Sequence, residues 1–230
     1  WETNELAALR DLSRSFCEKE IKPNIERFID QHHVDRELWN KAGEAGMLCS
    51  HIPEEYGGMA ADFLYSTVVI EEIGRLGLTG IGFSLHSDIV APYILHYGSE
   101  AQKQHYLPKL VSGEMVTAIA MTEPGAGSDL QGVKTTAVLD GDEYVINGSK
   151  TFITNGWLAD LVIVVAKTDP KAGAKGTSLF LVEANTPGFS KGKRLEKVGM
   201  KAQDTSELFF QDVRVPRENL LGQPGMALVV

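Results

Sequence analysis

Hydrophobic residues in the first half of the chain recur every three or four positions, which is the spacing of one helix face. A first long helix is marked by Leu6, Leu9, Leu12, Phe16 and Ile21. Further helices are predicted from a cap at Asp35 to Gly46, from Asp62 to Gly74 or Gly77, from about Thr79 to His96, and from Glu100 to Leu110. Ser99 and Gln102 form a capping-box pattern before the last of these. The fourth helix is apolar almost all round, so we expect it to be buried.

The pattern changes near Gly113, where short β-rich runs replace the helical spacing. Turn pairs such as Asp140-Gly141 and Asn147-Gly148 separate these runs. The predicted strands are Met115–Met121, Thr135–Leu139, Tyr144–Ile146, Lys150–Ile153, Leu161–Lys167, Ser178–Glu183, Phe189–Lys191, Arg194–Val198 and Ser206–Val213. Many short strands with turns between them predict an antiparallel sandwich or barrel.

We therefore predict an α+β multidomain chain. An all-α domain covers residues 1–114, an antiparallel β-barrel or sandwich covers 115–222, and 223–230 read like the start of another helix. With 230 residues and 43% hydrophobic content, the chain can bury one large core or two smaller ones.

Composition and charge remove several classes of function. A net charge of −9 argues against a nucleic-acid partner, because phosphates need a basic surface. Cys17 and Cys49 form no Cys-x-x-Cys pair and fit reduced thiols, and none of the six histidines has a recognised metal spacing. No run of eighteen apolar residues predicts a membrane span, and the first residues are too acidic and polar for a signal or transit peptide. We expect a cytoplasmic protein, or a mitochondrial-matrix protein if the source is eukaryotic.

The segment T-E-P-G-A-G-S-D, residues 122–129, is a strand-following loop rich in small residues. Glycines let a backbone approach a ligand closely, and the hydroxyls of Thr122 and Ser128 supply neutral hydrogen bonds. The spacing is not that of the dinucleotide fingerprint G-x-G-x-x-G. An ordinary Gly/Pro turn between strands is the alternative interpretation.

A second segment, residues 150–156, reads K-T-F-I-T-N-G. It alternates aromatic and hydroxyl residues like a strand and ends in Asn155-Gly156, a strong hairpin pair.

Together the two segments resemble the flavin-binding signature of the acyl-CoA dehydrogenases. The I-P-E-E-Y-G-G turn at 52–58, the segment 199–208, and the V-P and N-L-L-G motifs at 215–216 and 219–222 are similar to further landmarks of that family. Residues 84–90 and 128–132 look most like its long-chain branch. The resemblance covers essentially the whole chain in the family's order, and the family shows helices, then a barrel, then a C-terminal four-helix domain that this sequence does not include.

The resemblance implies bound FAD. The residues expected to line it are Ile119, Ala120, Met121, Thr122, Gly125, Ala126, Gly127, Ser128, Phe152, Ile153 and Thr154. Thr122 would contact the isoalloxazine edge, Thr154 would donate to flavin N5, and Phe152, where Trp is commoner, would pack against the ring system. Ser128 and Lys175 would contact substrate, although a solvated loop lysine is the favoured alternative for Lys175.

The implied reaction is FAD-dependent dehydrogenation of an acyl-CoA thioester to the trans-2-enoyl-CoA, with electrons passed to electron-transfer flavoprotein by a tetramer. Side chains cannot accept a hydride, so a flavin is needed. In the family the catalytic base is a glutamate of the C-terminal domain, so no catalytic residue is assigned here. Glu123 and Asp129 are expected to shape the loop, and the chain alone is expected to bind FAD weakly and not to turn over.

Two other hypotheses remain open from the sequence. One keeps the fold and lets oxygen reach the reduced flavin, as in acyl-CoA oxidases and some flavin monooxygenases. The other is a truncated, non-catalytic relative that serves as a folding or assembly module. The length and branching of the acyl chain are not predicted.

Overall fold

The computed structural model describes residues 3–227, which form two compact units. The helical unit comprises the residues up to His96 together with Glu100–Val116 and Glu196–Asp204. The strand unit comprises Tyr97–Ser99, Thr117–Leu195 and the residues from Thr205 onward. A helical part followed by a mostly antiparallel sheet confirms the predicted fold class.

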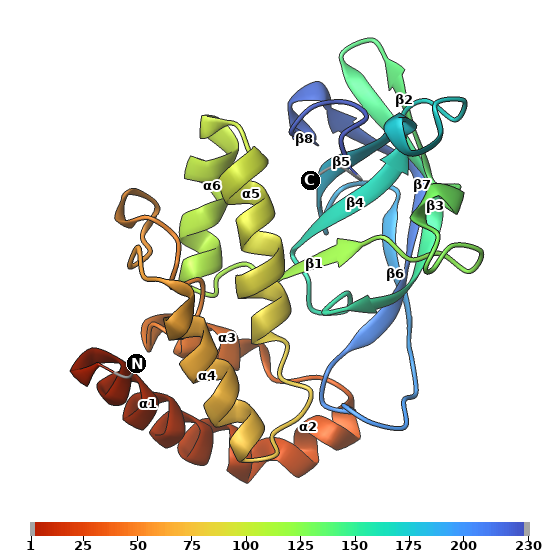
Figure 1. The fold of residues 1–230 in the computed structure, drawn as a ribbon. Coiled ribbons are helices and arrows are strands. Elements are labelled where there is room, and N and C mark those ends of the chain that lie inside the picture. The colour runs from red at the N-terminus through yellow and green to blue at the C-terminus, as the bar shows by residue number, and fades with distance from the viewer. Residues whose placement is uncertain (1–2, 228–230) are drawn as a thin grey trace. The chain divides into compact units, whose positions relative to one another are not determined.

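Helices form most of the helical unit (Figure 1), and most of them lie where the apolar spacing of the sequence predicts a helix. Its helices are α1 (Asn4–Phe16), α2 (Ile25–Gln31), α3 (Arg36–Glu44), α4 (Phe63–Arg75), α5 (Ala91–Tyr97, whose last residue joins the strand unit) and α6 (Glu100–Val111). Thr3 and Asp62 cap α1 and α4 by accepting backbone N–H groups, as short polar side chains do at helix starts. No helix within residues 3–227 is long and apolar enough to cross a bilayer.

Two predicted helices differ from the structure in their extent and in the type of their turns. The first helix continues beyond α1 through a π-helical turn, Cys17–Ile21, and a 3-10 turn, Lys22–Asn24, into α2, which the apolar spacing did not reveal. The fourth predicted helix begins after Gly82 rather than at Thr79, and it contains a π-helical turn, Leu85–Val90, before α5. Gly80 has φ +94, which a right-handed helix does not allow, so the helix cannot include this residue. An added Cβ there would lie 2.7 Å from Gln203 N, so glycine is required at this position.

The helical unit contains a buried carboxylate held by three arginines. Glu72 on α4 accepts hydrogen bonds from Arg14 at 3.0 and 3.1 Å, from Arg10 at 3.0 Å, and from Arg75 at 3.0 and 3.1 Å. The Glu72 side chain is fully buried, whereas those of Arg14 and Arg75 are 39% and 47% exposed. The hydrogen bonds from Arg14, aided by the other two arginines, lower the pKa of Glu72 to about 2. This cluster joins α1 to α4.

The strand unit is one sheet with the order β6-β7-β3-β2-β4-β5-β8, with β1 paired to β4. The strands are β1 (Thr117–Ala120), β2 (Thr136–Asp140), β3 (Glu143–Thr154), β4 (Leu161–Lys167), β5 (Thr177–Glu183), β6 (Phe189–Arg194), β7 (Thr205–Pro216) and β8 (Leu220–Leu221). The pairings are antiparallel except those of β4 with β1 and β2, which are parallel.

Three strand predictions are corrected. Asn147-Gly148 is not a turn: it lies inside β3 at a break in the register with β7, and a Cβ on Gly148 would lie 2.7 Å from Thr135 Cα. Glycine is needed there for a close approach of two strands. Asn155-Gly156 ends β3 but makes no hairpin, since β4 pairs with other strands. The runs at 189–191 and 194–198 form one strand that ends at Arg194.

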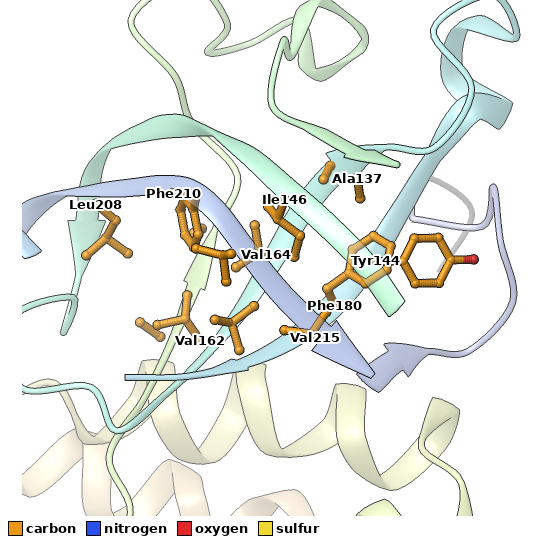
Figure 2. Packing of buried hydrophobic residues seen from close by; sticks show 14 of the residues in the cluster. Ala137, Tyr144, Ile146, Val162, Val164, Phe180, Leu208, Phe210 and Val215 are labelled. Atoms are coloured by element: carbon orange, nitrogen blue, oxygen red, sulfur yellow. The ribbon is translucent and has the colours of Figure 1, made fainter. Parts of the chain in front are cut away.

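The core of the strand unit is built from inward-facing side chains of six strands (Figure 2). Tyr144 and Phe180 meet edge to face with ring centroids 4.8 Å apart, and Ile146, Val162 and Val164 are fully buried. Up to Lys150, the alternation along β3 places Tyr144, Ile146 and Lys150 inward, and the register shifts between Lys150 and Ile153. This core holds the ends of β1 and β3, from which the candidate site is built.

Candidate functional site

The T-E-P-G-A-G-S-D segment forms a tight turn directly after β1. Glu123 N–H donates to Ala126 O at 2.9 Å, and Ala126 N–H donates to Glu123 O at 3.1 Å. The side chain of Ala126 is buried beneath the turn, whereas Gly125, Gly127 and Ser128 are exposed. The turn is therefore held by the buried Ala126, and its other small residues lie at the surface.

Neither glycine of this turn is required by the protein itself. A Cβ added to Gly125 or Gly127 would meet no atom within 4 Å. Both have a backbone conformation that other residues adopt, since neither has a positive φ. Glycine without a packing or conformational reason leaves room for something to approach the backbone.

The end of β3 is attached to this loop by a backbone hydrogen bond, and the residue after β3 is attached to β1 by its side chain. Thr151 N–H donates to Thr122 O at 2.9 Å, and Asn155 Nδ2 donates to Thr117 O at 3.3 Å. Segments that lie about thirty residues apart in the sequence are thus brought side by side, which confirms that the loop and the K-T-F-I-T-N-G segment meet.

A buried ion pair lies under both segments. Lys150 Nζ donates to Glu123 Oε1 at 2.9 Å and to Met121 O at 3.0 Å, and the Lys150 side chain is fully buried. Glu123 Oε1 also accepts Thr135 N–H at 3.0 Å, and Oε2 accepts Lys134 N–H at 2.7 Å. We call Lys150 and Glu123 the buried pair.

The electrostatics of the buried pair keep Glu123 charged. Burial acts to raise the pKa of Glu123, but hydrogen bonds from Thr135, Lys134 and Lys150 outweigh it, so the pKa lies below its usual range. Burial lowers the pKa of Lys150, and Glu123 opposes that shift. A carboxylate so fully occupied by donors is a structural group and not a free base.

Phe152 presents an aromatic ring from the end of β3. Its side chain is 66% exposed and its φ is 57°, in the left-handed region that bulky residues rarely adopt. The break in register between Lys150 and Ile153 permits this conformation. The neighbours of Phe152 point inward, so the irregular backbone turns this one ring outward.

The remaining predicted residues divide by exposure. Ala120, Ala126 and Ile153 belong to the buried interior of the strand unit, whereas Ile119, Met121, Thr122 and Thr154 are half-buried and Ser128 is exposed. Within the described residues, the hydroxyls of Thr122, Ser128 and Thr154 are not hydrogen-bonded to any protein group. These hydroxyls are available to a ligand or to water.

Lys175 and Asp129 lie at the margin of the site. Lys175 is exposed on the 3-10 turn Gly173–Gly176, which contacts the 3-10 turn Leu130–Gly132 beyond the loop. Asp129 caps that second turn, since its Oδ1 accepts Gln131 N–H at 3.1 Å. This confirms the expectation that Asp129 shapes local backbone.

Comparison with known protein families decides the relationship. Residues 3–114 match the family described as "Acyl-CoA dehydrogenase, N-terminal domain", and residues 118–213 match "Acyl-CoA dehydrogenase, middle domain". The chain belongs to the acyl-CoA dehydrogenase family. The predicted resemblance is confirmed, and both loops of the candidate site fall inside the matched middle domain.

Individual acyl-CoA dehydrogenases agree with the family match. The chain is 52% identical over 223 residues to the mitochondrial long-chain specific acyl-CoA dehydrogenase of Sus scrofa, covering 96% of this chain and 52% of that protein. An acyl-CoA dehydrogenase crystal structure from Geobacillus kaustophilus superposes with a TM-score of 0.97 at 53% identity, covering 100% of this chain and 61% of that one. The Bacillus anthracis enzyme complexed with FAD superposes with a TM-score of 0.92 at 38% identity, covering 99% and 39%. The chain spans about half the length of the curated relative it matches.

Lys150 is the residue of the site that sequence reasoning missed. Lysine is almost never fully buried without a partner, so its position in a strand motif gave no functional expectation. The usable signal was register: Tyr144 and Ile146 face the core, and Lys150 occupies the same inward parity of β3.

Proposed function

We propose that the protein is an FAD-dependent acyl-CoA dehydrogenase that converts an acyl-CoA thioester to the trans-2-enoyl-CoA. The family match and the 52% identity to a long-chain specific enzyme support this activity. The geometry supports it independently, through a loop that has room for a flat ligand and a neighbouring strand end that carries an exposed ring.

One observation carries the proposal. Gly125 and Gly127 face open space without any packing or conformational need for glycine, beside three hydroxyls that the described protein does not use. An ordinary turn between strands would explain the backbone of this loop but not the glycines. A flavin placed there would contact the backbone at the glycines and receive hydrogen bonds from the hydroxyls.

Each side chain of the site has a proposed task. Thr122 and Thr154 orient the flavin by hydrogen bonds at its edge, and Phe152 covers one part of the ring system and excludes water from it. Ser128 and Lys175 are assigned to the substrate, with the ammonium of Lys175 near the anionic CoA end. The flavin, when bound, supplies the hydride acceptor that no amino-acid side chain can provide.

We propose that the general base comes from outside these 230 residues. Glu123, the buried carboxylate of the loop, is committed to Lys150 and to two backbone N–H groups, and Asp129 caps a turn. A base for the α proton needs an accessible oxygen close to the substrate. The part of the chain described here is therefore expected to bind FAD weakly and not to turn over alone.

The proposed partners follow from the family. Electrons are passed to electron-transfer flavoprotein, and the intact protein is a homotetramer. The proposed location is the cytoplasm, or the mitochondrial matrix in a eukaryote, and the two buried free cysteines Cys17 and Cys49 fit such a reducing compartment.

The decisive experiment is an anaerobic titration of the intact protein with a panel of acyl-CoAs while the flavin absorbance is followed. Bleaching by at least one acyl-CoA, with slow reoxidation by air and fast reoxidation by electron-transfer flavoprotein, is expected. Fast reoxidation by air alone would indicate an oxidase or monooxygenase. Purified intact protein with no flavin bands and no bleaching would contradict the proposed activity.

A matched pair of glycine variants sharpens the experiment. Gly127→Ala places a methyl group in the space kept for the ligand, whereas Gly74→Ala on α4 also meets no atom but lies in the helical unit. Gly127→Ala is expected to fold about as stably as the wild type, and Gly74→Ala, which lies in a helix, slightly more stably. Only Gly127→Ala is expected to weaken FAD binding, and equal FAD binding by both would remove the argument from the glycines.

A further inference from the structure

We propose that Lys150 is a positioning residue for the cofactor loop, and that it acts by holding Met121 and Glu123 in place from inside the sheet. The proposal rests on the flavin site proposed above. It concerns a residue that touches neither cofactor nor substrate in that proposal and that works through the backbone of residues that do.

The contacts of Lys150 and its neighbour fix three successive loop residues. Lys150 Nζ binds the carbonyl of Met121 and the carboxylate of Glu123, at 3.0 and 2.9 Å. Thr151 N–H binds the carbonyl between them, that of Thr122, at 2.9 Å. One dipeptide of β3 therefore determines the backbone position of the loop at the point where it leaves β1.

The carboxylate of Glu123 extends this hold to the far side of the turn. Its two oxygens accept N–H groups of Lys134 and Thr135, eleven and twelve residues further along the chain. Its own backbone closes the turn with Ala126. The loop is thus anchored at its start, at its turn and at its exit, and Lys150 Nζ bridges the start and the turn.

The chemistry of the pair favours positioning over stability as its purpose. Removing two charges from water costs about as much as their attraction returns, so a buried ion pair is weak evidence for stability. An apolar residue at this inward position of β3 would fill the core without that cost. What an apolar residue cannot do is bind a backbone carbonyl and a carboxylate at the same time, which fixes their separation.

The consequence for the site is a pre-set distance between hydroxyls. Thr122 follows Met121 on the loop, and Thr154 lies on the same strand as Lys150. If Lys150 is lost, Met121 and Glu123 are free to shift relative to β3, and Thr122 shifts with them. In well-organised active sites, misplacing a positioning group by about 1 Å lowers the reaction rate on the order of a hundredfold.

The test separates positioning from stability with three variants of the intact protein. Lys150→Met leaves Glu123 as an unpaired buried charge. Lys150→Met/Glu123→Gln removes both charges and is expected to fold more stably than the single variant. Phe180→Ala removes a fully buried ring of β5 and is the control that loses folding stability without touching either loop.

Two readouts are measured on each variant. The first is FAD affinity, with the absorbance spectrum of bound FAD. The second uses no cofactor: it is amide hydrogen exchange at Thr151 and Ala126, whose N–H groups bind Thr122 and Glu123, relative to exchange at Val213 in the β3–β7 ladder.

The double variant is expected to bind FAD on the order of tenfold more weakly than wild type, with an altered flavin spectrum, and to exchange Thr151 and Ala126 faster relative to Val213. Phe180→Ala is expected to keep the FAD affinity and the relative exchange rates of wild type. Equal losses in the two proteins would overturn the positioning role. Wild-type protein that binds no FAD would overturn the proposed function and this role with it, while faster relative exchange in the double variant would then show only a structural anchor.

Discussion

Glu72 in the helical unit and Glu123 in the strand unit are both buried carboxylates, and the two are held in opposite ways. Glu72 in the helical unit lies under three arginines whose own side chains reach the surface. Glu123 in the strand unit is bound by one fully buried lysine and by two backbone N–H groups. The first arrangement has several partners that can replace one another, and the second has a single cation.

The difference shows how one kind of group serves two purposes. At Glu72 the charges tie one helix to another, and any one arginine shares its task with two more. At Glu123 each partner defines a separate point of the backbone, so none is redundant. Redundant partners are suited to stability, and single partners are suited to geometry.

The largest expected effect is that of breaking the single-cation arrangement. Lys150→Met should lower the free energy of unfolding by about 3–5 kcal/mol, because Glu123 is left as an uncompensated buried charge. Urea unfolding followed by circular dichroism at neutral pH measures this loss. A loss below about 1 kcal/mol would show that water reaches Glu123 and that the pair is not dry.

Acid should remove the stability that the charged Glu72 carboxylate contributes. The pKa of Glu72 is about 2 in the folded protein, against an ordinary value of 4.5. The unfolded chain therefore binds this proton more readily, so the stability from Glu72 is complete above pH 4.5 and is lost as the pH falls towards 2. Glu72→Gln should flatten the unfolding free energy over that window. Burial lowers the pKa of His86 from 6.5 to about 4. The unfolded chain therefore binds this proton more readily, and His86 lowers the stability as the pH falls from 6.5 to about 4.

A smaller effect is expected from removing one of several partners. Arg75→Met takes away a cation that is 47% exposed and leaves Arg10 and Arg14 on Glu72. The loss should be about 1 kcal/mol or less, measured by the same urea unfolding. If Arg75→Met cost as much as Lys150→Met, the contrast between shared and single partners would be wrong.

The smallest expected effect has the opposite sign. Phe152→Gly releases a left-handed backbone at a ring that packs little, so the flavin-free protein should gain up to about 1 kcal/mol of stability. Thermal unfolding without FAD measures the gain. The same variant should bind FAD less tightly, and a fall in flavin-free stability would mean that the ring packs more than its exposure suggests.

The sequence predicted features that depend on local chemistry. The Gly-rich turn, its hydroxyls and the cap at Asp129 follow from residue type and spacing, and the structure shows the turn and the cap. Asn147-Gly148 misled because the local turn preference of the pair was overridden by a non-local need, the close approach of β3 to Thr135. Lys150 could not be assigned because its role exists only when β3, the loop and Thr135 are assembled.

The outward ring of Phe152 has a consequence for the protein in the cell. Phe152 has an unfavourable backbone angle and an exposed aromatic ring, and a bound flavin would cover that ring. A ligand that binds only the native state raises its population by mass action. Chains that bind flavin should then resist proteolysis better than flavin-free chains.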